Sequence, residues 1–273
     1  MMNLAEYRSS ATRLADFLPW AALVATGVVL NKDGSFQRTA HFRGPDLDSA
    51  VPAELVGVAG RLNNALRRLG SGWAIFVEAQ RQPSSTYPES RFSDAASALV
   101  DAERKAAFEE EGVHYESAYF LTFLYLPPAW ESAGAERFLY EGRARTEGGD
   151  AHEMLAGFID RTDRVLKLLE GFMPESRWLD DGETLTYLHS CISTRRQRVR
   201  VPEVPMYLDA LLADQPLTGG LEPKLGGSHL RVLTIVGFPA ATTPGILDEL
   251  NRLAFAYRWS TRAIMLDKTD ATR

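Results

Sequence analysis

The sequence predicts an α+β protein, with mixed β-sheets, hairpins and packed helices arranged in two related halves. Near the amino end, two strand-like runs flank a turn sequence that is typical of a hairpin. Further along, segments with helical spacing lie between additional strand-like runs. A similar order of strands and helix recurs in each half, although no residue-level repeat links the two. Hairpins combined with helical connections are typical of the α+β class.

The amino-terminal hairpin is the strongest local signal. An apolar strand is expected over residues 22–30 and a second strand over 35–42, separated by the sequence NKDG at 31–34. Asp-Gly between two strand-like runs favours a tight reversal, because glycine accepts the positive φ that such a turn requires. We therefore expect this hairpin to begin the first sheet.

Helices and strands alternate through the rest of the first half, which we place at residues 1–130. A helix capped by Asp48 or Ser49 and a second helix over 93–111 carry apolar residues at helical spacing. Strands are expected over 73–79, where continuous apolarity predicts burial on both faces, and over 115–126, with a polar loop at 80–91. The residues of the second helix that are expected to face a core are Ala95, Ala98, Leu99, Ala102 and Ala106.

A stretch rich in Gly, Glu and Arg, residues 131–149, is expected to be a linker or insertion before the second half, residues 150–273. Capping-box spacing of Asp150 and Glu153 predicts the start of the longest helix. The other elements expected in this half are a helix over 181–193, short strands over 207–225, a strand over 229–238, a helix begun by Thr242 or Thr243 with Pro244 in its first turn, and a strand over 259–266.

Composition restricts the class of protein. The 273 residues are 45% hydrophobic and carry a formal charge of −6, which argues against a dedicated nucleic-acid binder. The single cysteine, Cys191, has no partner for an internal disulfide and is expected to be a small core residue. No basic region followed by an apolar core marks a signal peptide, and the longest apolar run, 17–30, is shorter than the roughly 20 residues of a membrane span.

A search for reactive groups finds no active site. The phosphate-loop pattern GxxxxGK[ST] is absent, and the glycine-rich stretches at 70–72 and 226–228 are expected to be turns because neither precedes a helix. His189 and Cys191 lie two positions apart on an expected helix, so they point to different faces and are unsuited to holding one metal ion. We therefore assign no catalytic, metal or cofactor residue.

Two stretches remain as candidate contact sites. The most basic run contains Arg195, Arg196, Arg198 and Arg200, which suit phosphate, anionic lipid or an acidic partner and equally suit a solvated loop. Near the amino end, Phe17, Leu18 and Trp20 are candidates for contact with a membrane partner, or are the lead-in to a buried strand.

Three blocks of sequence resemble a known family. Residues 14–50 (LADFLPWAALVATGVVLNKDGSFQRTAHFRGPDLDSA), 61–81 (RLNNALRRLGSGWAIFVEAQR) and 238–267 (FPAATTPGILDELNRLAFAYRWSTRAIMLD) are similar, in this order, to the amino-terminal region of the TrbE class of conjugal-transfer ATPases. This class belongs to the VirB/CagE/TrbE family of type IV secretion. The resemblance implies a longer parent protein whose carboxy-terminal motor uses ATP and magnesium, and none of that motor is found here.

The resemblance therefore implies a non-catalytic docking and assembly domain, and we expect the chain to be an isolated amino-terminal domain produced by truncation. Its expected partners are inner-membrane components of the secretion channel, its own carboxy-terminal ATPase domain and other copies of itself. The expected location is the cytoplasmic face of the inner membrane. Two alternatives stay open: a stand-alone enzyme that uses His189 and Cys191, and a nucleic-acid-binding module that uses the basic run at 195–200.

Overall fold

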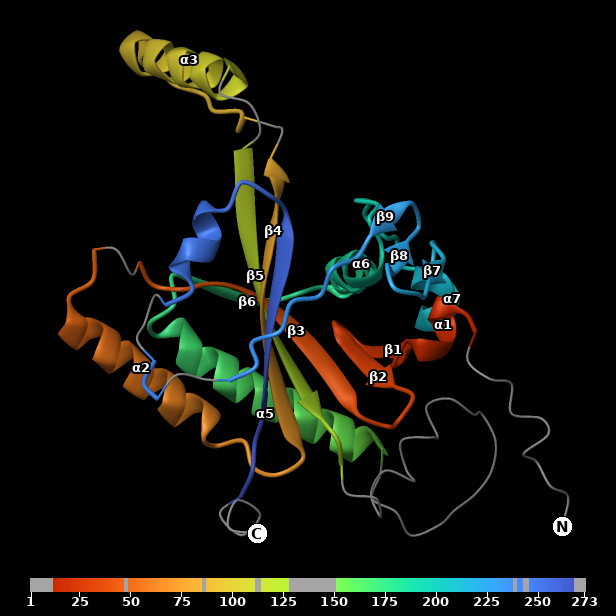
Figure 1. Ribbon diagram of the computed structural model, residues 1–273. Helices are drawn as coiled ribbons and strands as arrows, with labels where there is room; N and C mark the ends of the chain where they lie inside the picture. Colours follow the sequence, from red (N-terminus) through yellow and green to blue (C-terminus); the bar gives the residue numbers. More distant parts are fainter. Residues whose placement is uncertain are drawn as a thin grey trace, which may run out of the picture.

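The computed structural model describes residues 12–46, 49–84, 87–110, 114–127, 151–237, 240–242 and 246–267 (Figure 1). A large sheet forms the centre, and helices pack against both of its faces. The expected linker at 131–149 and the caps predicted at Asp48, Asp150 and Thr243-Pro244 lie outside the described residues.

Within the described parts of the chain, the main sheet has seven strands in the order β1-β2-β3-β5-β4-β10, and β6 pairs with β3 beyond the end of β2. The strands are β1 (Trp20–Ala25), β2 (Val28–Asn31), β3 (Phe36–Arg43), β4 (Trp73–Ser84), β5 (His114–Tyr125), β6 (Glu175–Trp178) and β10 (Tyr257–Ile264). The predicted α+β class is confirmed. The predicted mixed pairing is wrong, because all pairings among the described strands are antiparallel. The consecutive strands β3 and β4, which a helical connection joins, are separated in the sheet by β5, and β5 runs antiparallel to both.

The amino-terminal hairpin contains one more reversal of the chain than the sequence predicts. The single strand expected at 22–30 is folded into β1 and β2, which pair with each other and reverse at Gly27. Gly27 has a φ of +67°, and its amide donates to Asp181 Oδ1 at 2.7 Å. The turn predicted at 31–34 is confirmed between β2 and β3, where Gly34 has a φ of +83° and Asp33 Oδ1 accepts the amide of Ser35.

Strands from both expected halves share the main sheet. β6 and β10 come from the second half, and they pair with β3 and β4 of the first. The remaining sheet is small and consists of β7 (Leu217–Thr218), β8 (Lys224–Leu225) and β9 (Ser228–His229). The division at 131–149 stays a prediction, but the sheet itself is continuous across it.

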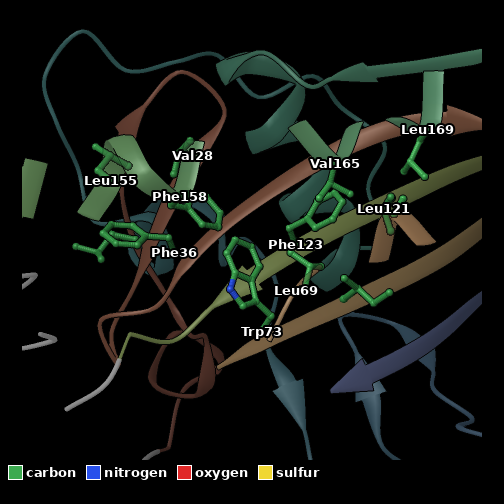
Figure 2. Close-up of a cluster of buried hydrophobic side chains, with 13 residues drawn as sticks. Val28, Phe36, Leu69, Trp73, Leu121, Phe123, Leu155, Phe158, Val165 and Leu169 are labelled. Carbon is green, nitrogen blue, oxygen red and sulfur yellow. The ribbon is translucent and has the colours of Figure 1, made fainter. Parts of the chain in front are cut away.

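Helices α2 (Pro52–Leu66) and α5 (Ala151–Glu170) cover one face of the sheet, and both were expected near these positions. In Figure 2, Trp73 of β4 lies at the centre of this core, where its ring stacks on Phe158 of α5 with 5.6 Å between centroids. Burial of side chains of this size contributes roughly 1.5–3 kcal/mol each. Ser49 is not the cap of α2, because its hydroxyl donates to Asp46, and the first turn is closed by Glu54, which accepts the amide of Val51.

The opposite face is covered by α1 (Leu14–Phe17), α6 (Asp181–Ile192) and α7 (Leu208–Leu212). The α6 helix was expected, and Asp180 caps it by accepting the amide of Glu183 at 2.7 Å. The α7 helix replaces part of the short strands expected over 207–225. Leu208 and Leu212 are both buried there at a spacing of four, which suits a helix and not a strand.

Several predicted boundaries in the sheet and after it are wrong. β4 continues to Ser84 through part of the expected loop, because β5 pairs with it along its whole length. Burial on both faces of this strand holds for Trp73–Ile75 and ends at Phe76. The strand expected over 229–238 is absent between residues 230 and 237, and the helix expected after Thr242 is reduced to a short 3₁₀ helix, η3 (Asp248–Arg252).

Candidate interaction site

The two longest strands extend past the rest of the sheet as a two-stranded ribbon. β3 pairs with β5 only as far as Tyr119, and β10 pairs with β4 only as far as Arg81, whereas β4 and β5 stay paired to Ser84 and His114. Helix α3 (Ala95–Glu110) lies at the far end of this ribbon, apart from the other helices (Figure 1). We call the ribbon and α3 the arm (residues 82–84, 87–110 and 114–116).

Ring contacts attach α3 to the ribbon. The ring of Phe108 stacks on that of His114 with 3.8 Å between centroids, and His114 Nε2 lies 2.7 Å from the backbone oxygen of Phe108. The hydroxyl of Tyr87 donates to Asp101 Oδ1 at 2.8 Å, and this hydrogen bond raises the pKa of Tyr87. The first contact joins the carboxy-terminal end of α3 to β5, and the second joins the middle of α3 to the segment that precedes the helix.

The apolar stripe of α3 faces solvent, which corrects the prediction that it faces a core. None of the 16 residues of α3 is buried, and Leu99 is 63% exposed. The predicted core residues that are exposed instead are Ala95, Ala98, Leu99, Ala102 and Ala106. A shallow hollow of about 340 Å³ beside the stripe is lined by Phe92, Ala96, Val100 and Arg104, among others. The helix was predictable from its periodicity, but its position at the end of a ribbon was not.

The basic run forms an exposed loop after α6. Arg195 Nη1 lies 3.6 Å from Asp214 Oδ2, and Arg196 Nη1 donates to the backbone oxygen of Pro83 at 3.4 Å. Arg198 and Arg200 are exposed and form no ion pair with any residue that the structure describes. The contact of Arg196 with Pro83 therefore brings the loop beside the base of the arm, whereas Arg198 and Arg200 are available for an anionic ligand.

The candidate contact residues near the amino end are separated by the fold. Phe17 is 65% exposed, but Leu18 and Trp20 are buried in the core beneath α6 and α7. Leu18 and Trp20 are therefore core residues, which corrects their assignment as a surface for a membrane partner. The reason is that β1 begins at Trp20, so its side chain points into the sheet face that α6 covers.

The described residues of 230–237, 246–247 and 249–266 expose further apolar side chains, which we call the carboxy-terminal surface. Its large side chains that are more than half exposed are Val232, Leu233, Ile235, Val236, Ile246, Phe255, Ile264 and Leu266. Such a concentration of exposed apolar side chains is typical of an interaction site in a folded domain. Sequence periodicity alone missed it, because the same residues predict a buried strand and helix.

A buried ion pair connects β4, β10 and α6. Arg258 Nε donates to Glu78 Oε1 at 2.6 Å, and Arg258 Nη1 donates to the backbone oxygen of Ser190 at 2.8 Å. Burial raises the pKa of Glu78, although Arg258 and the hydroxyl of Tyr187 act in the opposite direction. A charged residue in the apolar run WAIFVEA was a sequence signal for this pair, but its partner was not predictable because Arg258 is distant in the chain.

His189 and Cys191 do not form a joint reactive site. His189 is buried with Nε2 3.2 Å from Asp214 Oδ2, whereas the thiol of Cys191 donates to the backbone oxygen of Tyr187. Burial raises the pKa of Cys191 to about 12, which disfavours the nucleophilic thiolate. Among the described residues, no group of three His, Cys, Asp or Glu side chains is placed to hold a metal ion. None of the described helices has the length and apolar character needed to cross a bilayer.

Comparison with known proteins gives consistent matches. A family model for the amino-terminal domain of the type IV secretion system ATPase VirB4/TrbE matches residues 27–133. The conjugal transfer protein TrbE of Rhizobium radiobacter is 35% identical over 287 aligned positions, which cover 99% of this chain and 35% of that protein. The chain thus spans about a third of the length of the R. radiobacter relative.

Sinorhizobium fredii has two matching chains, which are named as successive pieces of a probable conjugal transfer protein TrbE. The first piece is 40% identical and matches 52% of this chain and 98% of its own length. The second piece is 42% identical over 33% of this chain and 13% of its own length. Nearly the whole of the first piece is therefore similar to this chain.

Proposed function

Because the chain belongs to the VirB4/TrbE family of type IV secretion ATPases, we propose that it is the docking and assembly domain of such an ATPase. In this role it couples the carboxy-terminal motor of a longer protein to inner-membrane components of the secretion channel, at the cytoplasmic face of that membrane. We assign the binding of ATP and magnesium to the motor and none of it to this chain.

The observation that carries this proposal is the arm. In a folded domain an amphipathic helix normally buries its apolar stripe, as α2 and α5 do here. The helix α3 is held by the contacts of Tyr87, Phe108 and His114, yet it leaves its stripe uncovered. A helix that is fixed at one side and apolar at the other supports binding of a partner along its outer face.

The basic loop supports a location beside the membrane. Arg198 and Arg200 are exposed on the loop whose Arg196 contacts the base of the arm. Guanidinium groups near a membrane surface are attracted to anionic lipid headgroups. We therefore expect the Arg198→Glu/Arg200→Glu variant to bind vesicles of phosphatidylglycerol severalfold more weakly than the unsubstituted chain, with no change on phosphatidylcholine. Equal binding of both proteins to the anionic vesicles would contradict the contact of Arg198 and Arg200 with anionic lipid.

The docking role is tested by cross-linking the full chain to inner membranes from a host that carries the transfer genes of a relative. Mass spectrometry should identify channel components encoded by those genes. The amount of channel component cross-linked to the Leu99→Asp variant should be at least about fivefold lower, since the substitution places a charge in the exposed stripe. Val56→Asp is the matched control, because Val56 is 73% exposed on α2 and outside the arm.

Leu99 is exposed, so its replacement should leave the thermal unfolding temperature within about 2 °C of the original value. This check separates loss of docking from loss of folding. Equal capture by the Leu99→Asp and Val56→Asp variants would contradict the docking role of the arm. ATP hydrolysis by this chain above that of a heat-inactivated sample would contradict the assignment of catalysis to the motor.

A further inference from the structure

We propose that residues 230–237, which we call the strap, add to the free edge of β10 as a further strand of the main sheet, in a parallel direction. The structure with the strap unpaired is then the open state. Strap addition produces a closed state in which the apolar side chains of the strap are covered. This inference is independent of which partner the arm binds.

The first observation is that the strap has a strand-like sequence but neither a strand partner nor cover for its apolar side chains among the described residues. Its sequence, LRVLTIVG, is rich in the β-branched and aliphatic residues that favour strands. The chain there contains no helix, turn or bend, and it has no ladder partner among the residues described. Val232, Leu233 and Val236 are 83%, 84% and 99% exposed, so the open state leaves a large apolar area in water.

The second observation is the free edge of β10. This strand is the last in the sheet order and pairs only with β4 among the described strands. A free edge presents unpaired backbone N–H and C=O groups, and natural proteins usually protect it with proline, lysine or a covering segment. β10 has neither proline nor lysine, and its two arginines lie against β4, with Arg258 paired to Glu78 and Arg262 over the ring of Phe76. Its residues from Ser260 to Ile264 are exposed.

The third observation is that the lengths and directions fit. The strap and β10 each contain eight residues, and the connection between them, 238–256, exceeds the dozen residues that a parallel crossover requires. In Figure 1, the light-blue chain that leaves β9 runs leftward and downward, and β10, the unlabelled dark-blue strand that leads to the C-terminus, runs downward. η3 lies within this connection, as a helix does in a strand–helix–strand unit.

Both ends of the unit are already attached to the folded domain. The amide of Leu230 donates to the backbone oxygen of Pro223 at 2.8 Å. The backbone oxygen of Leu253 accepts Arg81 Nε of β4 at 3.1 Å. The strap therefore begins at a residue that is attached to the domain, and the connection after it is attached again at Leu253, so strand addition changes only the chain between Leu230 and Leu253.

Hydrogen exchange on the full chain tests the inference. We expect amides in 231–236, together with alternate amides of β10 that point away from β4, to exchange at least about tenfold more slowly than unstructured amides. Thr234→Pro should abolish this protection, because proline has no N–H to donate and fits poorly within a sheet. Thr234→Ala is the matched control, since it keeps the amide and should keep most of the protection.

Disulfide trapping gives a second readout. The pair Leu233→Cys with Thr261→Cys joins the centres of the two segments and should oxidise readily, whereas Leu233→Cys with Val56→Cys on α2 should not. Hydrogen exchange of the 231–236 amides at the rate of unstructured amides in the unsubstituted chain and in both Thr234 variants would overturn the inference. Protection that rises with protein concentration would overturn it as well, because it would assign the strap to a second copy of the chain.

Discussion

Replacing Arg258 by methionine should destabilise the fold more at pH 8.5 than at pH 6.5. In the folded protein Arg258 Nε lies 2.6 Å from Glu78 Oε1, and the Glu78 side chain is only 9% exposed. Removing one partner of a buried ion pair costs about 3–5 kcal/mol, because the other charge stays in a medium that solvates it poorly. We expect a loss nearer this size at pH 8.5, because the higher pH favours the ionised form of Glu78.

The pH dependence follows from the environment of Glu78. Burial raises its folded pKa above the usual value for glutamate, and Arg258 opposes that effect. Without Arg258 the folded pKa rises further, so the folded state binds a proton more tightly than the unfolded state does. Stability is then greatest at low pH and is lost as the pH rises from the usual glutamate value through the folded pKa. Since pH 6.5 lies closer than pH 8.5 to the usual glutamate value, it favours the neutral form of Glu78 more, and the loss should be smaller there.

Urea unfolding at both pH values measures these losses, with the unsubstituted chain as the reference at each pH. Both conditions lie above the sequence pI of about 5.5, so the protein keeps a negative net charge. Glu78→Gln should also be destabilising, but the double variant with Arg258→Met should lose less than the sum, because no buried charge remains. The control is Arg252→Met, since its pair with Glu249 is 78% exposed on each side. Equal losses of the Arg258→Met variant at both pH values, or additive losses in the double variant, would refute the reasoning.

Three further predictions concern single positions. Gly27→Ala should cost more than about 2 kcal/mol in urea unfolding, because Gly27 has a positive φ and a Cβ there would clash with the backbone oxygen of Leu179. Gly57→Ala, in the open middle of α2, is the control and should be neutral or stabilising by up to about 1 kcal/mol. Trp20→Ala should lower the free energy of unfolding by about 3–5 kcal/mol, because Trp20 is buried, whereas Phe17→Ala should change it by less than about 0.5 kcal/mol. Comparable losses in the two variants would contradict the assignment of Trp20 to the core and Phe17 to the surface. The thiol of Cys191 should react with iodoacetamide at pH 8 at least about 100-fold more slowly in the folded chain than in the urea-unfolded chain, because burial raises the pKa of this thiol to about 12. Similar rates in the two states would contradict the burial of Cys191.

Local patterns in the sequence identified most of the regular elements. The helices at 52–66, 95–110, 151–170 and 181–192 and the strands at 114–125 and 257–264 lie close to their predicted positions. These elements were predictable because periodicity, caps and turn residues act within a few positions of the chain. The same patterns predicted one strand at 22–30, and they did not reveal that Gly27 reverses the chain in its middle.

The candidate sites depended on information that local patterns do not contain. A helical stripe is equally apolar whether it faces a core, as in α5, or solvent, as in α3. Leu18 and Trp20 were equally ambiguous, because burial depends on whether another segment, here α6, covers them. The pairing of Glu78 with Arg258 joins residues 180 positions apart, so no short window predicts it.

The sequence by itself determined the α+β class, the family and the absence of the phosphate-loop pattern, because each is written in residue types and their spacing. Tertiary structure decided which apolar stripes are covered, which edge of the sheet stays free, and which residues of the arm, the basic loop and the carboxy-terminal surface are accessible. The physical reason is that periodicity reports the preference of a segment for burial, whereas burial itself requires a second segment whose position is set by long-range pairing.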